Sequence, residues 1–416
     1  MSAPDAFVCV DLDGTPYLTG RLWIHAKGSS ERASFEYDDG WIRARHRFAL
    51  DPALQIGKGP YHTAAGRALF SAIGDSAPDR WGRTLLARRE RLEAKEDGRT
   101  PRTLLEIDYL LGLSDFTRQG ALRFKREEDG PFLAEGGDRV PPFIELGRLL
   151  EAAERVAENE ETKEDLRLLL APGSSLLGSR PKASVRGKDG DLMIAKFNRP
   201  DDDYDVGRWE AIAMRLAGMA GVNVASWSAE QVAGRTVLLM RRFDREGVVR
   251  IPFLSAMSML EARYGEHRSY MEIADALRMH SASALDDLRE LWRRVAFTIL
   301  ISNTDDHLRN HGFLYAGEQG WRLSPAYDLN PVPTDVRPRI LSTAIVEGED
   351  RSASMDLAFL AAEHFGIERH EAKGIAQEVA RAVVRWRDVA MELGASEMEC
   401  ERMATAFEHD DLAAAR

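Results

Sequence analysis

The stretch that decides the fold is Ile301–Asn310, ISNTDDHLRN, which is followed at Ser324–Asp328 by SPAYD. Asp305 precedes Asn310 by five residues, and Asp328 follows a second predicted strand. Enzymes of the protein-kinase type use such an arrangement. Their first Asp accepts the proton of the substrate hydroxyl, and the Asn and the later Asp hold magnesium against the nucleotide phosphates. The spacing therefore predicts Asp305 as the base and Asn310 and Asp328 as magnesium ligands.

A solvated surface loop is the simpler interpretation of this polar stretch. It explains the polarity, but it does not explain why Asp328 follows a second strand at the matching distance. We therefore favour chemistry with a metal and a nucleotide. His307 is interpreted as a nucleotide-positioning or local hydrogen-bonding group, because Asp305 already holds the position expected of the general base.

Composition places the chain among ordinary globular proteins. Its 416 residues predict two or three domains, and 44% of them are hydrophobic and 30% charged. The formal net charge is -12 and the pI is about 5.5, whereas a free-standing nucleic-acid binder normally has a basic face. Direct binding to DNA is therefore not expected, although DNA could be reached through a basic partner.

Cysteine usage and the N-terminus indicate the compartment. Cys9 and Cys400 are the two cysteines, and their separation allows neither a disulfide framework nor the ligand spacing of a zinc site. The chain begins without a basic start followed by a long apolar run, so neither a signal peptide nor a transmembrane helix is predicted. We expect a cytoplasmic protein with reduced thiols and no membrane partner.

The order of predicted elements is that of a kinase. Strands alternate early in residues 1–128, where Asp13-Gly14 between apolar runs predicts a hairpin. Residues 140–256 predict helices at about 143–158 and 207–220, with strands between and after them. Residues 257–416 follow a helical pattern. We therefore predict an α+β, two-lobed protein-kinase-like fold with a β-rich N-terminal subdomain and an all-helical C-terminal lobe.

A small-residue loop, Gly173–Lys182 (GSSLLGSRPK), could present backbone N–H groups to phosphate oxygens. It lacks the Gly-Lys-Ser/Thr ending of a Walker A motif, and a plain surface turn explains it equally well. Taken by itself, this loop leaves both interpretations open.

A lysine and a candidate hinge complete the nucleotide site. Lys196 lies in an apolar strand, where a buried ammonium needs a partner, and Glu210 on the next helix could supply one. The alternative is an edge-strand lysine and a solvated glutamate. Leu238–Arg245 ends a strand where a hinge between lobes should lie, so Met240 or Phe243 could pack on adenine. A strand followed by a charged turn is the alternative there.

These motifs together resemble the HipA family of serine/threonine kinases, which are toxin components of bacterial toxin–antitoxin systems. Five segments carry the resemblance in order and spacing: Ser175–Lys182, Ile194–Lys196, Arg242–Arg245, Thr304–Asn310 and Tyr327–Leu329. It covers residues 170–400 well and the N-terminal part more loosely. The chain departs from the family at Asp306, which stands where the family often has glycine.

The resemblance implies specific roles for the residues of these segments. It implies ATP and magnesium as cofactors, Asp305 as base, Asn310 and Asp328 as magnesium ligands, and Lys196 as a phosphate contact. Gly178 and Lys182 belong to the implied phosphate loop.

The resemblance also implies autophosphorylation of Ser175 in the phosphate loop, with Ser174 as a neighbouring competitor. A phosphoserine carries about -1.5 to -2 charges, and it would repel the ATP phosphates and shut off the kinase. A purely structural serine is the alternative.

The resemblance further implies an aminoacyl-tRNA synthetase as a plausible protein substrate. It also implies a helix-turn-helix antitoxin of the HipB type, through which DNA would be reached indirectly. Two other functions compete with this interpretation. The kinase fold could be a binding module that recruits an antitoxin without phosphoryl transfer. Asp11–Thr15 (DLDGT) resembles the first motif of haloacid-dehalogenase-type phosphatases, but the next residues predict a returning strand.

Overall fold

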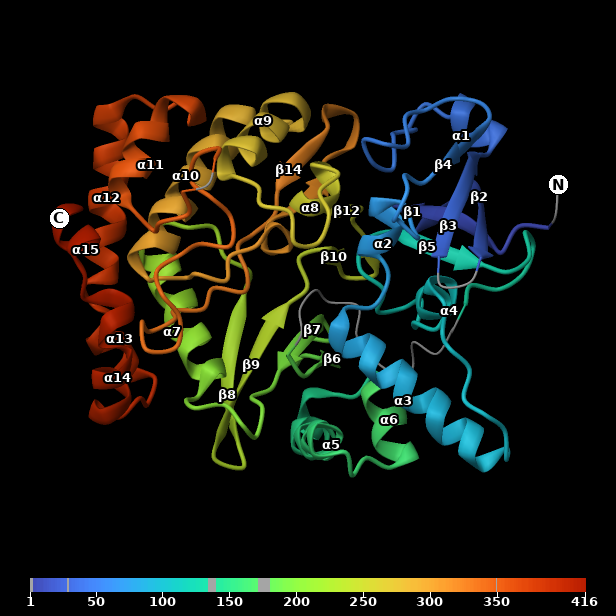
Figure 1. Ribbon diagram of the computed structural model, residues 1–416, viewed down its shortest axis with the longest axis horizontal. Helices are drawn as coiled ribbons and strands as arrows, with labels where there is room; N and C mark the ends of the chain where they lie inside the picture. The colour runs from blue at the N-terminus through green and yellow to red at the C-terminus, as the bar shows by residue number, and fades with distance from the viewer. Residues whose placement is uncertain (1–2, 28–29, 134–139, 171–179, 349) are drawn as a thin grey trace. The chain divides into compact units, whose positions relative to one another are not determined.

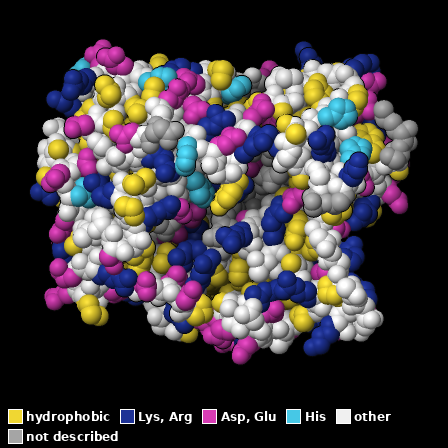
Figure 2. Space-filling view, in the orientation of Figure 1, with side chains coloured by type: hydrophobic (Ala, Val, Ile, Leu, Met, Phe, Trp, Pro, Cys, Tyr) yellow, Lys and Arg dark blue, Asp and Glu magenta, His cyan; other side chains and the backbone are white. Residues whose placement is uncertain are grey.

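The computed structural model describes residues 3–27, 30–133, 140–170, 180–348 and 350–416. It divides into two compact units, of which the first comprises residues 1–201 and 232–254 and the second residues 202–231 and 255–416. Both units combine helices with antiparallel strands, which confirms the predicted α+β class (Figure 1). Basic and acidic side chains are interspersed on the face shown in Figure 2.

The first unit opens with a five-stranded antiparallel sheet in the order β4-β3-β2-β1-β5. Its strands are β1 (Ala6–Leu12), β2 (Thr15–Lys27), β3 (Ser30–Tyr37), β4 (Pro60–His62) and β5 (Leu122–Lys125). The predicted hairpin joins β1 and β2, and its turn residues Asp13 and Gly14 have φ angles of 51° and 79°. Two positive φ angles are typical of a type I′ turn, whose twist matches that of the strands.

The remaining elements of the first unit are helices and a second set of strands. The helices are α1 (Asp39–Arg43), α2 (Ser71–Asp75), α3 (Arg80–Glu96), α4 (Glu106–Leu111), η2 (Phe143–Glu145), α5 (Leu146–Glu158) and α6 (Lys163–Leu170). The strands are β6 (Lys182–Arg186), β7 (Leu192–Lys196), β9 (Arg235–Arg241), β10 (Arg245–Glu246) and β11 (Val249–Arg250). β6, β7 and β9 lie side by side in this order, and β6–β7 and β7–β9 are antiparallel pairs.

One hydrophobic core of the first unit joins helices to this second set of strands. Trp81 and Leu85 of α3 pack with the apolar faces of α5 and α6 and with buried residues of β6, β7 and β9. The Trp81 indole also donates a 3.0 Å hydrogen bond to the carbonyl of Lys182, and Asp79 caps α3 by accepting from Gly82 N at 2.8 Å. The start of α3 is therefore fixed against the first residue of β6.

The second unit is dominated by helices. They are α7 (Val206–Met219), α8 (Ala256–Met259), α9 (Tyr270–His280), α10 (Ala284–Leu300), η3 (Leu308–Asn310), η4 (Gly317–Gln319), α11 (Met355–Ala361), η5 (Ala362–Phe365), α12 (Arg369–Val383), α13 (Trp386–Glu392), α14 (Glu397–Phe407) and α15 (Asp410–Ala414). The predicted stop of α7 is confirmed, since Gly221 follows it with a φ of 73°. β8 (Trp227–Val232) and β12 (Phe253–Ser255) carry the chain across the unit boundaries.

The predicted all-helical lobe also holds a short antiparallel hairpin of β13 (Gly312–Tyr315) and β14 (Trp321–Leu323). The strand predicted before Asp328 is β14, whereas β13 has only four residues, too few to display an alternating pattern. Buried charges of α10 hold this hairpin: Asp287 accepts from Arg322 at 3.0 Å and from Leu323 N at 3.1 Å, and Arg294 donates to Ser324 O at 2.7 Å. α10 therefore fixes the segment that leads to Asp328.

Two further predictions concern the thiols and the lack of a transmembrane helix. Cys9 and Cys400 are both buried, and burial raises the pKa of the Cys9 thiol to about 11. In the described part of the chain, no helix has the length and apolar character needed to cross a membrane.

Candidate active site

The loop after α10 turns its two consecutive aspartates in opposite directions. Ser302 begins the loop with a φ of 52°, an uncommon conformation for a residue with a side chain. The side chain of Asp305 is 64% exposed and its Oδ1 lies 2.9 Å from Arg337 Nη1, whereas Asp306 is buried. The predicted base therefore faces solvent, as a group that receives a substrate proton must.

Asp306 anchors this loop in the core of the second unit. Its Oδ2 accepts from the Tyr270 hydroxyl at 2.5 Å and from Thr298 Oγ1 at 3.3 Å, and His311 Nε2 lies 3.2 Å away. Burial by itself raises the pKa of Asp306, but His311 and the Tyr270 hydrogen bond outweigh it, so that this pKa lies below its usual range. Burial and the neighbouring carboxylate raise the pKa of Tyr270 well above its usual value. No local pattern in the sequence predicts this cluster, because Tyr270 lies on another helix, 36 residues before Asp306.

A later segment of the second unit holds the backbone of the same loop. Ser342 donates to Thr304 O through its backbone N–H and its hydroxyl, both at 3.0 Å, and Thr343 Oγ1 donates to Asp306 O at 2.8 Å. Arg339 donates to Ser302 Oγ at 3.1 Å and pairs with Asp411 in the last helix. The loop is thus held at both ends by side chains from outside it.

Asn310 has the free oxygen that a metal ligand requires. Its Nδ2 makes a 3.5 Å contact with the carbonyl of Asp305, while its buried Oδ1 has no hydrogen-bond partner among the described residues. Thr304 Oγ1 and His307 Nδ1 are also buried without a partner there. A buried polar atom without a partner is unfavourable, so these atoms fit a loop that is completed by a bound cation or ligand.

Asp328 lies on a second loop that is bonded to the first. It follows β14 and has a φ of 60°, which is uncommon for a residue with a side chain. On either side of it, the Tyr327 hydroxyl donates to Arg309 O at 2.6 Å and Asn330 N donates to Asn303 Oδ1 at 3.4 Å. These two bonds link the segment that carries Asp328 to the loop that carries Asn310.

Magnesium fits this pair of loops chemically. Mg²⁺ prefers oxygen ligands, and nucleotide sites commonly hold it through one or two protein groups together with substrate phosphates. Asp328 offers carboxylate oxygens and Asn310 an amide oxygen, on two bonded loops. Within the described ranges, no group of three or more His, Cys, Asp or Glu side chains could hold a metal by itself. A metal here would complete its coordination with phosphate and water oxygens.

The first unit places two of the predicted phosphate contacts opposite one another. Lys182 of β6 and Lys196 of β7 are direct partners in an antiparallel pair, so their side chains leave the same face of the sheet. Lys182 is buried, and its Nζ lies 2.8 Å from Asp79 Oδ2. The Asp79 carboxylate offsets the positive charge of Lys182. Without it, the ammonium groups of Lys182 and Lys196 would repel one another. The sequence reasoning missed this role of Asp79, which lies about a hundred residues earlier.

Other predicted contacts remain predictions. Ser175 and Gly178 lie outside the described residues. Glu210 is buried in α7 of the second unit, whereas Lys196 belongs to the first unit. The pairing of Glu210 with Lys196 therefore stays a prediction.

The candidate hinge begins at the end of β9. Met240 is buried there and pairs with Ile194 of β7. Phe243 follows in a turn, where it is half-buried, and its ring lies 6.3 Å from that of Phe253. Contact of Met240 or Phe243 with adenine stays a prediction. The turn itself is fixed by its charged residues Arg242, Asp244 and Arg245.

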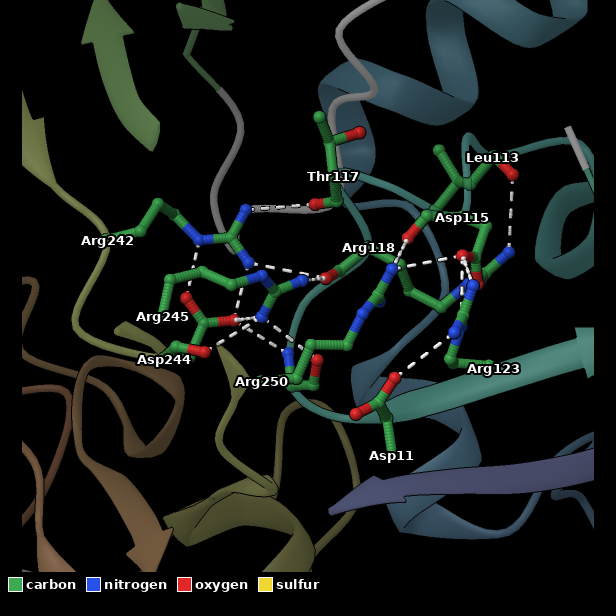
Figure 3. A network of polar contacts seen from close by, with 11 residues as sticks. Asp11, Leu113, Asp115, Thr117, Arg118, Arg123, Arg242, Asp244, Arg245 and Arg250 are labelled. Carbon is green, nitrogen blue, oxygen red and sulfur yellow. Dashed lines mark hydrogen bonds and ion pairs between the residues drawn. The ribbon is translucent and has the colours of Figure 1, made fainter. Parts of the chain in front are cut away.

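Asp244 is the centre of a buried charge network in the first unit (Figure 3). It accepts from Arg242 Nε at 2.6 Å, Arg245 Nη1 at 2.9 Å and Gly120 N at 2.7 Å. The two guanidinium groups also donate to the carbonyl of Arg118, at 3.3 and 2.5 Å. The hinge is therefore bonded directly to the segment that precedes β5.

The charges of this network shift one another's pKa values. Burial by itself raises the pKa of Asp244, but Arg242 and Arg245 outweigh it, and the pKa lies well below its usual range. Burial lowers the pKa of Arg245 to about 9 and that of Arg118 to about 10. Asp244, Arg245 and Arg118 therefore remain charged at neutral pH, although they are kept out of water.

Asp115 continues the same network toward the first sheet (Figure 3). Arg250 Nη2 donates to Asp115 Oδ2 at 3.0 Å, Arg123 Nη2 donates to the same oxygen at 2.6 Å, and Arg123 Nη1 donates to Asp11 Oδ2 at 3.1 Å. Asp11 is thus a buried structural carboxylate in a hairpin strand. A phosphatase of the haloacid-dehalogenase type would need a loop and a helix after this strand, so the hairpin interpretation is confirmed.

Comparison with known proteins identifies the family of this chain. Residues 174–387 match the family model of the HipA-like C-terminal domain, and residues 12–105 match that of the HipA N-terminal domain. A Sinorhizobium fredii protein named "Putative kinase Y4mE" is 27% identical over 71% of this chain and 71% of its own length. A Haemophilus influenzae protein named "Putative kinase" is 26% identical over 45% of this chain, and the match spans 62% of that protein's length.

A solved structure shows the same fold. HipA of Shewanella oneidensis, determined in a complex with HipB and its operator DNA, superposes with a TM-score of 0.65 at 17% identity. The match covers 99% of this chain and 96% of that chain. The predicted HipA-type, protein-kinase-like fold is therefore confirmed.

Proposed function

This chain belongs to the HipA family, and on that premise we propose that it is an ATP- and magnesium-dependent serine/threonine protein kinase. The observation that carries the proposal is the Oδ1 of Asn310, which has no hydrogen-bond partner within the described ranges. It lies in a loop that presents Asp305 to solvent and is bonded to the segment of Asp328. A binding module without catalysis could use the Asn310 oxygen to hold a metal, but it would not require the exposed Asp305 carboxylate.

In the proposed reaction, the Asp305 carboxylate accepts the proton of a Ser or Thr hydroxyl while that oxygen bonds to the γ-phosphorus of ATP and ADP leaves. Asn310 and Asp328 would hold magnesium, which would supply positive charge to neutralise the phosphates. The further proposed nucleotide contacts are Ser175, Gly178, Lys182, Lys196, Glu210, Met240, Phe243 and His307. A phosphate contact by Lys182 requires that the Lys182 ammonium group bind phosphate while it stays paired with the Asp79 carboxylate.

The biological role is proposed from the family. We propose a cytoplasmic toxin of a toxin–antitoxin system that phosphorylates a protein, with an aminoacyl-tRNA synthetase as the candidate target. A helix-turn-helix antitoxin of the HipB type would be its partner and its link to DNA. The solved HipA complex with HipB and operator DNA supports this partner class.

Incubation with labelled ATP, magnesium and a cell lysate tests the proposed function. We expect phosphate to appear on serine or threonine of a lysate protein that mass spectrometry can identify. Nucleotide binding with magnesium but without transfer to any protein would favour the binding module instead.

Asp328→Ala should weaken the binding of nucleotide in the presence of magnesium. The substitution removes a carboxylate from a site of hard oxygen ligands, and without magnesium the difference from the wild type should disappear. Calorimetric titration with ATP in the presence and absence of magnesium measures both effects. Asp356→Ala, which changes an exposed carboxylate in the first turn of α11, is the control. Equal affinity for Mg-ATP in the Asp328 variant and in this control would show that another group holds the metal.

Ser175→Ala should prevent a slow loss of activity during incubation with Mg-ATP. A phosphate on Ser175 would compete with ATP for the same backbone N–H groups and repel its charge. Timed activity assays and mass spectrometry of proteolytic peptides, fragmented to locate the phosphate, follow this process, and Ser174→Ala is the matched control. Phosphate found only on Ser174, or continued activity with Ser175 unmodified, would contradict the proposal.

A further inference from the structure

An exposed face at the end of α7, in the second unit, carries two adjoining depressions. α7 lies beside α12 and α13 in this unit (Figure 1). The larger depression has a volume of about 610 Å³ and the smaller one of about 430 Å³. Met219, the last residue of α7, lines both of them. We call the two depressions that meet at Met219 the α7 groove.

The larger depression is mainly apolar. Its accessible lining includes the side chains of Met219, Val224, Trp227 and Leu393. Met219 is 37% exposed, and the other three are half-buried, so that all four can be reached from solvent. A partner that covers these side chains with apolar groups of its own removes both surfaces from water, which is favourable.

The smaller depression is basic. It is lined by Arg293, Arg381, Arg385 and one acidic residue, Glu378. Arg293 is already paired, because its Nη1 lies 2.8 Å from Glu378 Oε2 and donates to Ala220 O at 2.9 Å. Arg381 uses its Nε to bond a backbone carbonyl of its own helix, and its guanidinium is otherwise exposed.

The positive charge of the α7 groove is not matched by the protein itself. Arg215 of the larger depression and Arg381 and Arg385 of the smaller one are exposed, and none forms an ion pair with the described residues. Glu378, whose charge is matched by Arg293, is the one acidic residue in the described lining. The whole chain has a formal net charge of -12. A surface of opposite sign in such a chain attracts an acidic partner.

Gly218 leaves the larger depression open to close approach. It lies within α7, where glycine is less favourable than every residue except proline. It is exposed, it lines the depression, and a methyl group at this position would meet no atom within 4 Å. A glycine on an exposed helix face lets the backbone of a partner come close.

From this arrangement we infer that the α7 groove binds an acidic, amphipathic segment of a partner protein. Apolar side chains of that segment fill the larger depression, and its carboxylates pair with Arg215, Arg381 and Arg385. A nucleic acid would match the arginines, but it offers no aliphatic side chains to the apolar part. The inference does not depend on the proposed kinase function, because no residue that lines the groove belongs to the proposed nucleotide or magnesium site.

Selection from a library of short random peptides tests this inference. The peptides are displayed on phage and selected on the whole chain, and those that bind Gly218→Gln equally well are discarded. Glutamine fills the groove without adding charge, so this step does not itself favour acidic peptides. The fold should persist, because the position is open and glutamine favours a helix more than glycine does.

The retained peptides should contain more Asp and Glu than Lys and Arg, together with large apolar residues. Their affinity for Gly218→Gln should be lower by about ten-fold, since an extra side chain in a packed contact is costly. Gly374→Gln is the matched control and should bind as the wild type does. Gly374 is an equally open glycine of α12 that lines neither depression.

Charge reversal tests the arginines. Arg385→Glu should weaken binding of the retained peptides by about five-fold, and high ionic strength should reduce this difference because it screens exposed charges. Arg369→Glu is the control, since Arg369 is exposed in the first turn of α12, about 18 Å along the helix from Arg381. Fluorescence anisotropy with labelled peptides measures the dissociation constants.

Three results would overturn the inference. They are the absence of any peptide that distinguishes the wild type from Gly218→Gln, retained peptides without an excess of acidic residues, and equal affinities of Arg385→Glu and Arg369→Glu. Self-association of the wild type that Gly218→Gln abolishes would assign the groove to a second copy of the chain instead. Because the binding assay contains no ATP, failure of the kinase assay leaves this inference standing, and failure here leaves the kinase standing.

Discussion

Asp305→Asn is expected to lower the rate of phosphoryl transfer by about 10²–10⁴-fold, the usual effect of removing a general base. The amide keeps the shape of the carboxylate but cannot accept the hydroxyl proton. The fold should persist, because this side chain is exposed and the loop is anchored by Asp306. Affinity for Mg-ATP should change little, since neither proposed magnesium ligand is altered.

Single-turnover transfer of labelled phosphate, titration with Mg-ATP and thermal unfolding together measure these effects. Asp356→Asn, at an exposed position of α11, should behave as the wild type in all three. Near-normal transfer by the Asp305 variant would reject this residue as the base. A loss of transfer accompanied by a loss of folded protein would show a structural role instead.

Asp244→Ala is expected to lower the free energy of unfolding by about 3–5 kcal/mol, the usual effect of removing one partner of a buried ion pair. It leaves the guanidinium groups of Arg242 and Arg245 buried without their carboxylate, and Gly120 N without its acceptor. Urea unfolding measures the difference. Asp191→Ala is the control, because its pair with Arg241 at 3.1 Å is partly exposed and should contribute only about 0–1 kcal/mol.

The same variant should change the response to acid. The pKa of Asp244 is lower in the folded protein than its ordinary value of 3.8. Its contribution to stability is therefore fully present above that ordinary value and is lost as the pH falls toward the folded pKa. Below pH 4 the wild type should lose more stability than Asp244→Ala. Equal urea midpoints for the Asp244 and Asp191 variants, or identical acid profiles of the wild type and Asp244→Ala, would show that the network does not stabilise the fold.

The sequence by itself determined the features that depend on local pattern. Asp13-Gly14 predicted the hairpin because a type I′ turn requires two positive φ angles. The spacing of Asp305 and Asn310 predicted a catalytic loop, and the apolar periodicity of residues 285–299 predicted the helix α10 that precedes this loop. Such signals are short-range, because residues a few positions apart share a turn, a strand or a helix face.

Only the tertiary structure decided which groups meet across the chain. Asp305 and Asp306 are adjacent residues of the same type. Asp305 nevertheless faces solvent, whereas Asp306 is buried against Tyr270 and His311. Asp79 pairs with Lys182 from about a hundred residues away. In the candidate hinge, Arg242 and Arg245 likewise donate to backbone carbonyls of Thr117 and Arg118, more than a hundred residues earlier. Periodicity shows which residues are buried but not what they touch. A buried charge needs a specific partner, and the packing of distant elements chooses that partner.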